Sequence, residues 1–243
     1  MLRFLFIFSF FLLATTPVLA QTSEVALIWE AKTYAPVWYE GRTLPTPSSL
    51  VRVVAVPTIY NSSGVKLKVQ DLDFNWRKDG VEIRSASGAG RDTFDYRAAS
   101  RAGEVNLIEV NVARRDGVSV AAGEARVSVA RPELRFYAIK DGVIDHTKSL
   151  ARLQIVSDET KIIAEPLFFS IEDWLNRRLS FEWSIKGQKI VPATEDPRRL
   201  TVVATADQVG ETALDLAVLN KNYPLQSATG KLPIGFGLNT FQF

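Results

Sequence analysis

The chain has 243 residues, of which 47% are hydrophobic and 23% are charged, with a formal net charge of +2 and no cysteine. A chain so close to neutral lacks the excess of basic residues that draws proteins to nucleic acid. Without cysteine it has no disulfide, thiol nucleophile, Cys-ligated zinc or iron–sulfur cluster, so its core must hold by packing alone.

Residues 1–20 are typical of a signal peptide. Arg3 precedes an apolar run over residues 5–14, and Val18 and Ala20 end the segment in the pattern that signal peptidase cleaves. We therefore expect the mature chain to be exported to the periplasm, the cell surface or the extracellular space. The alternative is a retained membrane anchor, although the apolar run is shorter than the ~20 residues of a spanning helix. No later window is long enough to span a membrane as a helix.

Residues 24–130 carry the pattern of a β module. The β-branched run VRVVAVP (residues 51–57) and the alternating segment FNWRK (residues 74–78) predict strands that bury one face. A Lys-Asp-Gly turn follows, in which Gly80 tolerates the positive φ of a tight hairpin. Gly123, in the middle of a later strand, predicts a β-bulge. Closely spaced turns between short strands predict an antiparallel sandwich.

Residues 133–236 repeat this pattern. The segment SFEWSIKGQKI (residues 180–190) echoes DFNWRKDGVEI (residues 73–83), with phenylalanine, tryptophan, glycine and isoleucine at the same places. Trp76 and Trp183 are 107 residues apart in the chain, and Gly123 and Gly230 are separated by the same 107 residues. We therefore interpret the chain as two copies of one module.

A short proline linker joins the two copies. Pro132 removes a main-chain donor and favours an extended Arg131, so we expect a semi-rigid rod of two modules. One helical turn is predicted, over residues 170–179, where Ser170 and Asp173 have the spacing of a capping box.

The repeated tryptophan segment resembles strand C and the following turn of immunoglobulin-like domains. Residues 102–107, AGEVNL, are similar to the approach to strand F, with Leu107 in place of the family's cysteine and Leu214 in the second copy. The resemblance implies an all-β chain of two tandem immunoglobulin-like β-sandwiches, with Trp76, Trp183, Leu107 and Leu214 in the cores. Because the family's disulfide and tyrosine corner are missing, the closest resemblance is to bacterial immunoglobulin-like and PKD-like surface modules that lack the disulfide.

A second resemblance concerns the start of the mature chain. Residues 27–36, LIWEAKTYAP, are similar to the opening of uncharacterised exported proteins of candidate-phylum bacteria, which continue with tandem sandwich modules. This likeness implies a bacterial source and brings no established activity to the chain.

Residues that could carry catalysis are scarce. His146 is the only histidine and lies in a polar turn, so a solvated loop histidine is favoured over a triad member. Motifs for a nucleophile elbow, a zinc peptidase, a phosphate loop or a dinucleotide site are missing, so we expect no enzyme activity and no cofactor. Asp71 with Asp73, and Asp141 with Asp145, offer oxygen ligands for calcium, but their spacing favours solvated turns and no metal site is predicted.

The segment from Glu30 to Leu50 differs most between the two copies. It carries Tyr34, Trp38 and Tyr39 before two closely spaced prolines, whereas its counterpart is the plainer KDGVIDHTKSL. Aromatic side chains on a rigid loop suit a partner-binding surface or a platform for stacking sugars. The alternative is that they pack onto the sandwich edge or the junction. Tyr34, Trp38 and Tyr39 are the candidate ligand- or partner-binding residues.

Residues 237–243, GLNTFQF, extend past the last predicted strand and carry Leu238, Phe241 and Phe243. This strand-like tail is most simply expected to fold back over an edge strand. Alternatively, the three side chains belong to a strand that is added to a partner's sheet. A signal of the outer-membrane barrel type is least favoured, because barrels need many lipid-facing strands.

These features predict an exported, non-enzymatic structural or adhesive protein of the cell envelope. It would act through contacts with another envelope or surface protein, for example within a surface appendage. The alternative function is a carbohydrate-binding accessory module that uses the aromatic loop, and an enzyme ranks third. Nucleic acid is not an expected partner.

Overall fold

The structure is a computed structural model that describes residues 23–155, 159–175, 177–203 and 209–237. The predicted signal peptide and the tail residues Leu238, Phe241 and Phe243 lie outside the described residues. The described chain is built from strands, with one short α-helix and one 3-10 turn. Neither of these is long and apolar enough to cross a membrane.

The first sandwich, here called module one, is formed by β1 to β8. One sheet has the strand order β1-β2-β6, and the facing sheet has the order β4-β3-β7-β8, with β5 paired to β3. All of these pairings are antiparallel. The elements are β1 (Glu24–Ala31), β2 (Leu50–Thr58), η1 (Val69–Asp71), β3 (Leu72–Lys78), β4 (Val81–Glu82), β5 (Gly88–Ala89), β6 (Thr93–Arg97), β7 (Val105–Arg114) and β8 (Ser119–Ser128).

The second sandwich, module two, is formed by β9 to β17. Its sheets have the orders β10-β9-β12-β15 and β11-β17-β16-β13-β14, and β11 runs parallel to β17. The elements are β9 (Glu133–Lys140), β10 (Val143–Asp145), β11 (Leu153–Ile155), β12 (Glu159–Leu167), α1 (Ile171–Leu175), β13 (Leu179–Ile185), β14 (Gln188–Ile190), β15 (Arg199–Val203), β16 (Gly210–Asn220) and β17 (Ser227–Phe236).

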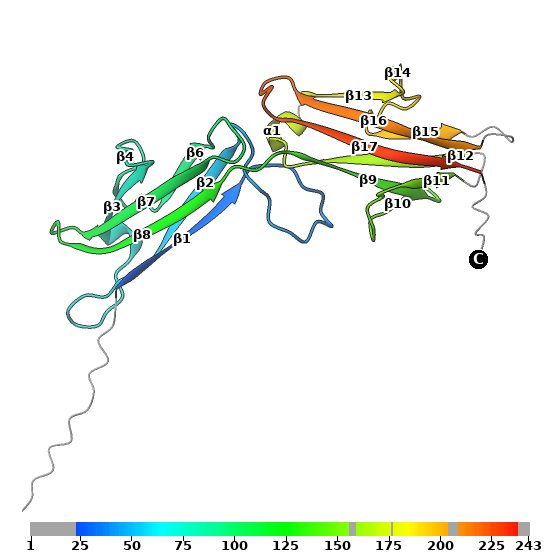
Figure 1. Ribbon diagram of the computed structural model, residues 1–243. Coiled ribbons are helices and arrows are strands. Elements are labelled where there is room, and N and C mark those ends of the chain that lie inside the picture. The colour runs from blue at the N-terminus through cyan, green and yellow to red at the C-terminus, as the bar shows by residue number, and fades with distance from the viewer. Residues whose placement is uncertain (1–22, 156–158, 176, 204–208, 238–243) are drawn as a thin grey trace, which may run out of the picture.

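Both modules have the strand order of an immunoglobulin-like sandwich. In module one the strands correspond to A-B-E packed on C′-C-F-G, and in module two β9-β12-β15 pack on β14-β13-β16-β17 in the same order. The predicted all-β fold of two tandem immunoglobulin-like sandwiches is therefore confirmed. Figure 1 shows the modules end to end, with β1 beginning and β17 ending at opposite ends of the molecule.

The repeated tryptophans lie at the centre of the two cores. Trp76 and Trp183 are each 0% exposed, as the repeat predicts. Each indole Nε1 donates a hydrogen bond of 2.8 Å to a main-chain carbonyl on the next strand connection, that of Arg91 and that of Pro197 respectively. A buried indole N–H needs such an acceptor, so the two modules satisfy the same requirement in the same way.

The two leucines matched by the repeat differ in burial. Leu214 is fully buried, whereas Leu107 is only partly buried and its neighbour Ile108 takes the core position. The ladder explains the difference, because Trp76 lies opposite Val110 with Ile108 two residues before it on the same face. The prediction of Leu107 as a core residue is therefore wrong by one position.

The two mid-strand glycines permit close approach of another strand instead of forming a bulge. A Cβ on Gly123 would lie 2.9 Å from the carbonyl oxygen of Val25, and one on Gly230 would lie 2.9 Å from the ring of Phe136. The register shift of module one lies elsewhere, between Val112 and Ala113. The predicted bulge at Gly123 is therefore wrong, and the glycine serves the packing of β1 on β8.

Candidate functional site

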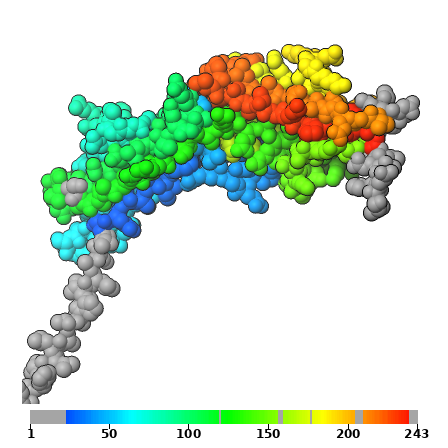
Figure 2. Space-filling model, viewed as in Figure 1, coloured from blue at the N-terminus to red at the C-terminus, as the bar shows by residue number. Residues whose placement is uncertain are grey.

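The segment between β1 and β2, residues 32–49, leaves module one and lies against module two; we call it the arm. Figure 1 shows it crossing the junction beneath the start of β9, and Figure 2 shows it filling the space between the sandwiches on that side. The arm also contacts the linker, since the N–H of Ala130 donates to the carbonyl of Pro45 at 2.7 Å. This hydrogen bond holds the arm against the linker.

Main-chain hydrogen bonds join the arm to the turn between β12 and α1. The N–H of Tyr34 donates to the carbonyl of Phe169 at 2.7 Å, and the N–H of Phe168 donates back to the carbonyl of Tyr34 at 2.7 Å. Thr33 and Ser170 form an antiparallel bridge between the same two segments. A short β pairing thus crosses from one module to the other.

Two buried polar side chains strengthen this crossing. Thr46 of the arm donates from Oγ1 to the carbonyl of Phe168 at 2.7 Å, and Gln226 of module two donates from Nε2 to the carbonyl of Pro47 at 2.7 Å. Both side chains are fully buried. Buried polar groups of this kind rigidify a contact when all of their partners are present, and are costly when a partner is lost.

Gln226 belongs to a wider polar network that fixes the turn between β16 and β17. Its Oε1 accepts hydrogen bonds from the N–H of Ser170 at 3.0 Å and from Nδ2 of Asn220 at 2.9 Å. Asn220 also donates to Asp173 at 2.9 Å, and Asn222 donates to the same carboxylate at 2.6 Å. Asp173 therefore ties α1 to this turn, which differs from its predicted place in a capping box with Ser170.

Almost all buried polar side chains of the described residues gather at this junction. Apart from Asn106, which lies within module one, they belong to the arm or to the parts of module two that meet it or support those parts. They are Thr33, Thr46, Ser49, Glu165, Ser170, Asp173, Asn220 and Gln226.

Phe168 lies at the centre of the junction in an unfavourable backbone conformation. Its φ is 67°, a left-handed value that bulky residues rarely adopt, and its side chain is 1% exposed. Its N–H and its carbonyl are both held by the arm, through Tyr34 and Thr46. Conformations of this kind persist only where the surroundings hold them firmly, so the arm compensates for strain in module two.

The three candidate aromatic residues all contact module two. Tyr34 stacks on Trp174 with ring centroids 4.3 Å apart, and Tyr39 meets Phe168 edge-on at 5.7 Å. Trp38 meets the edge of Tyr137 at 4.9 Å. Of the alternatives open from the sequence, packing onto the junction is the one that these contacts match.

Part of Trp38 remains accessible. It lines a hollow of about 610 Å³ together with Tyr39, Tyr137 and His146. His146 is exposed and stacks on Trp38 with ring centroids 5.4 Å apart, so one face of the indole is already covered.

A buried carboxylate completes the junction. Glu165 is 2% exposed and accepts hydrogen bonds from the Tyr34 hydroxyl at 3.1 Å and from Nη1 of Arg198 at 3.0 Å. Burial raises the pKa of Glu165, although Arg198 and Tyr34 oppose this shift. Burial and the nearby Glu165 also raise the pKa of Tyr34. Arg198 in turn lies 5.0 Å from the ring of Trp174, on which Tyr34 stacks.

Of the aspartates considered as calcium ligands, Asp145 is hydrogen-bonded to neighbouring side chains. Asp145 accepts hydrogen bonds from Lys140 at 2.8 Å and from Thr147 at 2.6 Å. Within the described ranges, no group of three or more His, Asp or Glu side chains is placed to hold a metal ion.

No family model and no curated protein matches the chain. Solved structures that are similar include immunoglobulin domains 1–4 of Sidekick-1, with 11% identity and a TM-score of 0.28, covering 85% of this chain and 74% of that chain. Fibronectin(III)-like modules of Clostridium thermocellum CbhA match with 11% identity and a TM-score of 0.25, covering 89% of this chain and 97% of that chain. The strand order of both sandwiches and their two buried tryptophans show the immunoglobulin-like β-sandwich fold.

Proposed function

We propose that this protein is an exported, non-enzymatic structural or adhesive component of the cell envelope that acts through protein–protein contacts. The observation that supports this role is the buried junction, which fixes one sandwich against the other through Thr46, Phe168 and Gln226. A signal-peptide-like start, residues 1–20, supports export.

A fixed junction suits a protein that holds its partners at a set distance and angle. Neighbouring domains in one chain move relative to each other unless their interface is extensive. Here the arm adds a β pairing and buried hydrogen bonds to a short linker, so less conformational freedom is lost when a partner binds across the two modules. The function is therefore that of a stiff spacer or scaffold.

Stiffness is tested by inter-module distance measurements. Spin labels on one exposed site of each module should give a single narrow distance distribution in the wild-type chain. Thr46→Val combined with Gln226→Leu removes the two fully buried side-chain donors that cross the junction, so the distribution should broaden. The matched control, Thr93→Val with Gln188→Leu, changes exposed strand residues and should leave it narrow.

The cellular role is tested by fractionation and by complementation in the source organism. We expect the mature protein in the envelope or the medium, and we expect the junction variant to fail in assembly or adhesion while remaining exported. Recovery of the protein in the cytoplasm would contradict the proposal. So would full assembly by a junction variant whose modules are shown to move freely.

The accessible part of Trp38 favours one second candidate, a carbohydrate-binding module. Sugars would stack on the aromatic wall of the hollow beside Tyr39 and Tyr137. A glycan array separates the two functions, with Trp38→Ala as the test variant and Val37→Ala, at a fully exposed neighbour, as the control. Binding that only Trp38→Ala abolishes would replace the scaffold with the carbohydrate-binding function.

A further inference from the structure

In module one a short strand closes the side of the sandwich beside the core tryptophan. This strand, β5, pairs with β3, and Gly88 lies opposite Phe74. The N–H of Gly90 donates to the carbonyl of Leu72 at 2.9 Å. Gly88 and Gly90 have φ values of 134° and 69°, which glycine adopts readily and other residues rarely do. The edge of β3 is thereby covered at Leu72 and Phe74.

The sequence of module two does not permit the same strand. At the separation that relates the two core tryptophans, Glu195 and Pro197 take the places of Gly88 and Gly90. Proline has no N–H to donate and its ring fixes φ near −65°, so Pro197 can supply neither the hydrogen bond nor the conformation of Gly90. Among the described residues, β13 pairs only with β16 and with β14, and β14 extends no further than Trp183. The edge of β13 before Trp183 is therefore open.

This open part of β13 turns main-chain groups away from the sheet. The carbonyl of Arg178 accepts a hydrogen bond at 3.0 Å from the N–H of Lys221, which directly follows β16. Main-chain groups alternate between the two sides of a strand, so those of Leu179 and Phe181 point away from β16. Within the part of the chain that the structure describes, no main-chain hydrogen bond reaches them from that side.

An apolar hollow of about 460 Å³ lies along the open edge. Its apolar walls come from α1, from β13 and from the segment before β15, namely Trp174, Leu175, Leu179, Phe181 and Pro197. Leu175 is 72% exposed, and Phe181 is only partly buried, whereas its counterpart Phe74 in module one is 1% exposed. We call this hollow, together with the edge of Leu179 and Phe181, the slot.

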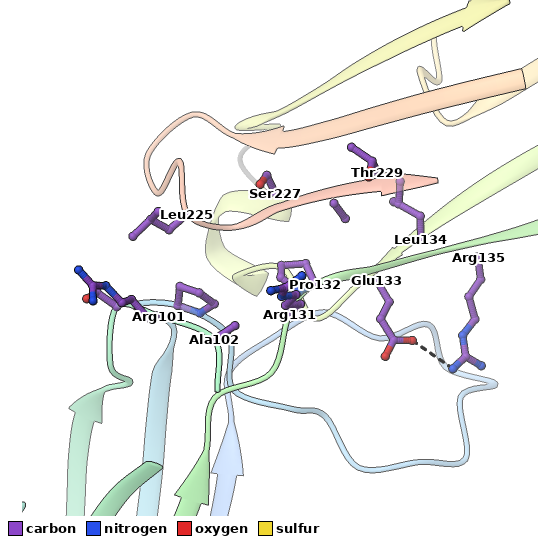
Figure 3. Close-up of a pocket in the computed structure, with 13 residues that line it drawn as sticks. Arg101, Ala102, Arg131, Pro132, Glu133, Leu134, Arg135, Leu225, Ser227 and Thr229 are labelled. Carbon is purple, nitrogen blue, oxygen red and sulfur yellow. Dashed lines mark hydrogen bonds and ion pairs between the residues drawn. The ribbon is translucent and has the colours of Figure 1, made fainter. Parts of the chain in front are cut away.

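The slot differs from the larger hollow at the junction, which has about 760 Å³ and lies between β9 and β17 (Figure 3). A Cβ on Gly230 of β17 would lie 3.3 Å from the Cβ of Leu134 on β9, so those two strands leave no room for a third. The slot borders one strand edge, and its counterpart in module one is occupied by a strand.

The geometry of the slot specifies its occupant. Residues that lie opposite each other in an antiparallel pair point to the same face of the sheet. Residues opposite Leu179 and Phe181 therefore point into the hollow. In module one these places belong to glycines, whereas the hollow of module two accepts large apolar side chains. The occupant is thus an extended segment with large apolar residues at alternate positions.

The tail of this chain has that pattern. In GLNTFQF, residues 237–243, Phe241 and Phe243 alternate with polar residues and fall on one face of an extended strand. With Phe241 opposite Phe181 in antiparallel register, Phe243 lies opposite Leu179. Both aromatic rings then face the apolar walls of the slot.

A tail cannot reach the slot of its own chain. Along β16, the residue opposite Phe236 is Gly210 and the residue opposite Phe181 is Val218, which are separated by about 27 Å of strand. Residues 238–243 span at most about 20 Å from Gly237. The tail can therefore occupy only the slot of another molecule.

We propose that the slot binds residues 238–243 of a second copy of this chain by β-augmentation. The contact joins the end of module two in one copy to the side of module two in the next. A contact between two different surfaces does not close on itself, so copies add head to tail. The inference rests on the proposed scaffold function and deepens it by naming the partner as another copy.

Peptide binding tests the occupant. Fluorescence anisotropy with the mature chain should show binding of fluorescein-labelled GLNTFQF. A control peptide of the same composition, GLNFFTQ, should not bind, because adjacent phenylalanines point to opposite faces of a strand. N-methylation of the Phe241 amide should weaken binding about fivefold, since this N–H pairs with β13, whereas N-methylation of Thr240 should have no effect.

A substitution in the slot tests the site. Leu175→Asp should weaken binding at least about tenfold, because it places a charge on the apolar wall. Val143→Asp, at a residue of module two that is 69% exposed and lies on β10, is the matched control and should bind as the wild type does. An unchanged thermal transition in each variant shows that the fold is intact.

Self-association tests the partner. In sedimentation velocity the mean mass of the mature chain should rise with concentration. Leu175→Asp, and Phe241→Ser with Phe243→Ser, should each abolish this rise, whereas Val143→Asp should retain it.

Absence of binding by GLNTFQF, equal binding of GLNFFTQ, or equal loss in Val143→Asp would overturn the proposal. Peptide binding without self-association of the chain would also overturn it, because the occupant would then belong to another protein. None of these outcomes alters the inter-module distances or the cellular fraction of the protein, so the docking site and the scaffold function fail separately.

Discussion

At the scale of single residues, some buried aromatic side chains stabilise the core of one module and another stabilises the contact between the modules. Trp76 and Trp183 occupy equivalent places, each fully buried and each donating its indole N–H to a main-chain carbonyl. Phe168 differs from the tryptophans, because it combines burial with a strained φ of 67°. The tryptophans therefore serve the cores that the copies share, while Phe168 serves the junction that only the pair has.

Replacing either core tryptophan should be severely destabilising. Trp76→Ala or Trp183→Ala leaves a large cavity and an unpaired carbonyl, so the free energy of unfolding should fall by about 3–5 kcal/mol. Urea denaturation monitored by circular dichroism measures this loss. Trp38→Ala, which removes a half-buried ring, is the comparison and should cost less. Equal losses at all three positions would mean that the cores do not depend on the repeated tryptophans.

Glu165 gives the junction a pH dependence. Because burial raises its pKa above the ordinary 4.5, the folded state holds the proton more tightly than the unfolded state does. The contribution of Glu165 to the free energy of unfolding should therefore decrease as pH rises from about 4.5. Denaturation across pH 4 to 7 should show the wild type losing stability relative to Glu165→Gln. The opposite slope would mean that Arg198 outweighs burial.

At the scale of elements, the approach of the first strand to the last distinguishes the two sandwiches. A Cβ on Gly123 of β8 would meet the main chain of β1, whereas a Cβ on Gly230 of β17 would meet the side chains of Phe136 and Leu134 on β9. An added methyl group would therefore press on main chain in module one and on side chains in module two.

This difference predicts unequal tolerance of alanine. Gly123→Ala forces a Cβ against the main-chain oxygen of Val25, so module one should lose about 1–3 kcal/mol of stability. Gly230→Ala presses on the ring of Phe136, which can turn, so module two should lose less. Thermal unfolding of the two variants makes the comparison. A larger loss of stability for Gly230→Ala would show that the Phe136 ring cannot move aside to accommodate the added methyl group.

The elements themselves could be predicted from the sequence, because strand alternation and turn chemistry are local. The Lys-Asp-Gly turn has the positive φ values expected of its hairpin, 50° at Asp79 and 80° at Gly80. The repeat predicts Leu107 as the core residue one position before Ile108, because the stretch from Trp76 to its ladder partner Val110 is one residue longer than the stretch from Trp183 to Leu216. A one-residue shift moves a side chain to the other face of a strand.

The junction could be predicted only in outline. The aromatic and proline residues of the arm mark it as unusual, and packing onto the junction was among the alternatives. Its hydrogen bonds could not be foreseen, since Thr46 and Phe168 are 122 residues apart and Pro47 and Gln226 are 179 residues apart. No periodicity relates such distant positions, and an isolated threonine or glutamine gives no local signal of burial.

At the scale of the whole molecule, the junction should make two sandwiches unfold as one. The wild-type chain should give a single calorimetric transition, because losing either module leaves buried donors and acceptors of the other without partners. Thr46→Val with Gln226→Leu should split this transition into two. The Thr93→Val, Gln188→Leu control should keep one. Two transitions in the wild type would show that the modules are energetically independent despite their contacts.

The separation of the contacting residues also sets an order of events during folding. Module one precedes the rest of the junction in the chain, yet its arm meets partners as late as Gln226. Contacts between distant residues are slow to form, and domains generally fold from the N-terminus as the chain is made. The arm therefore stays without its partners until nearly the whole chain is available. Closure of the junction is thus a late step that reports on completion of the molecule, and a chain cut short before Gln226 retains an arm whose Pro47 carbonyl has lost its donor.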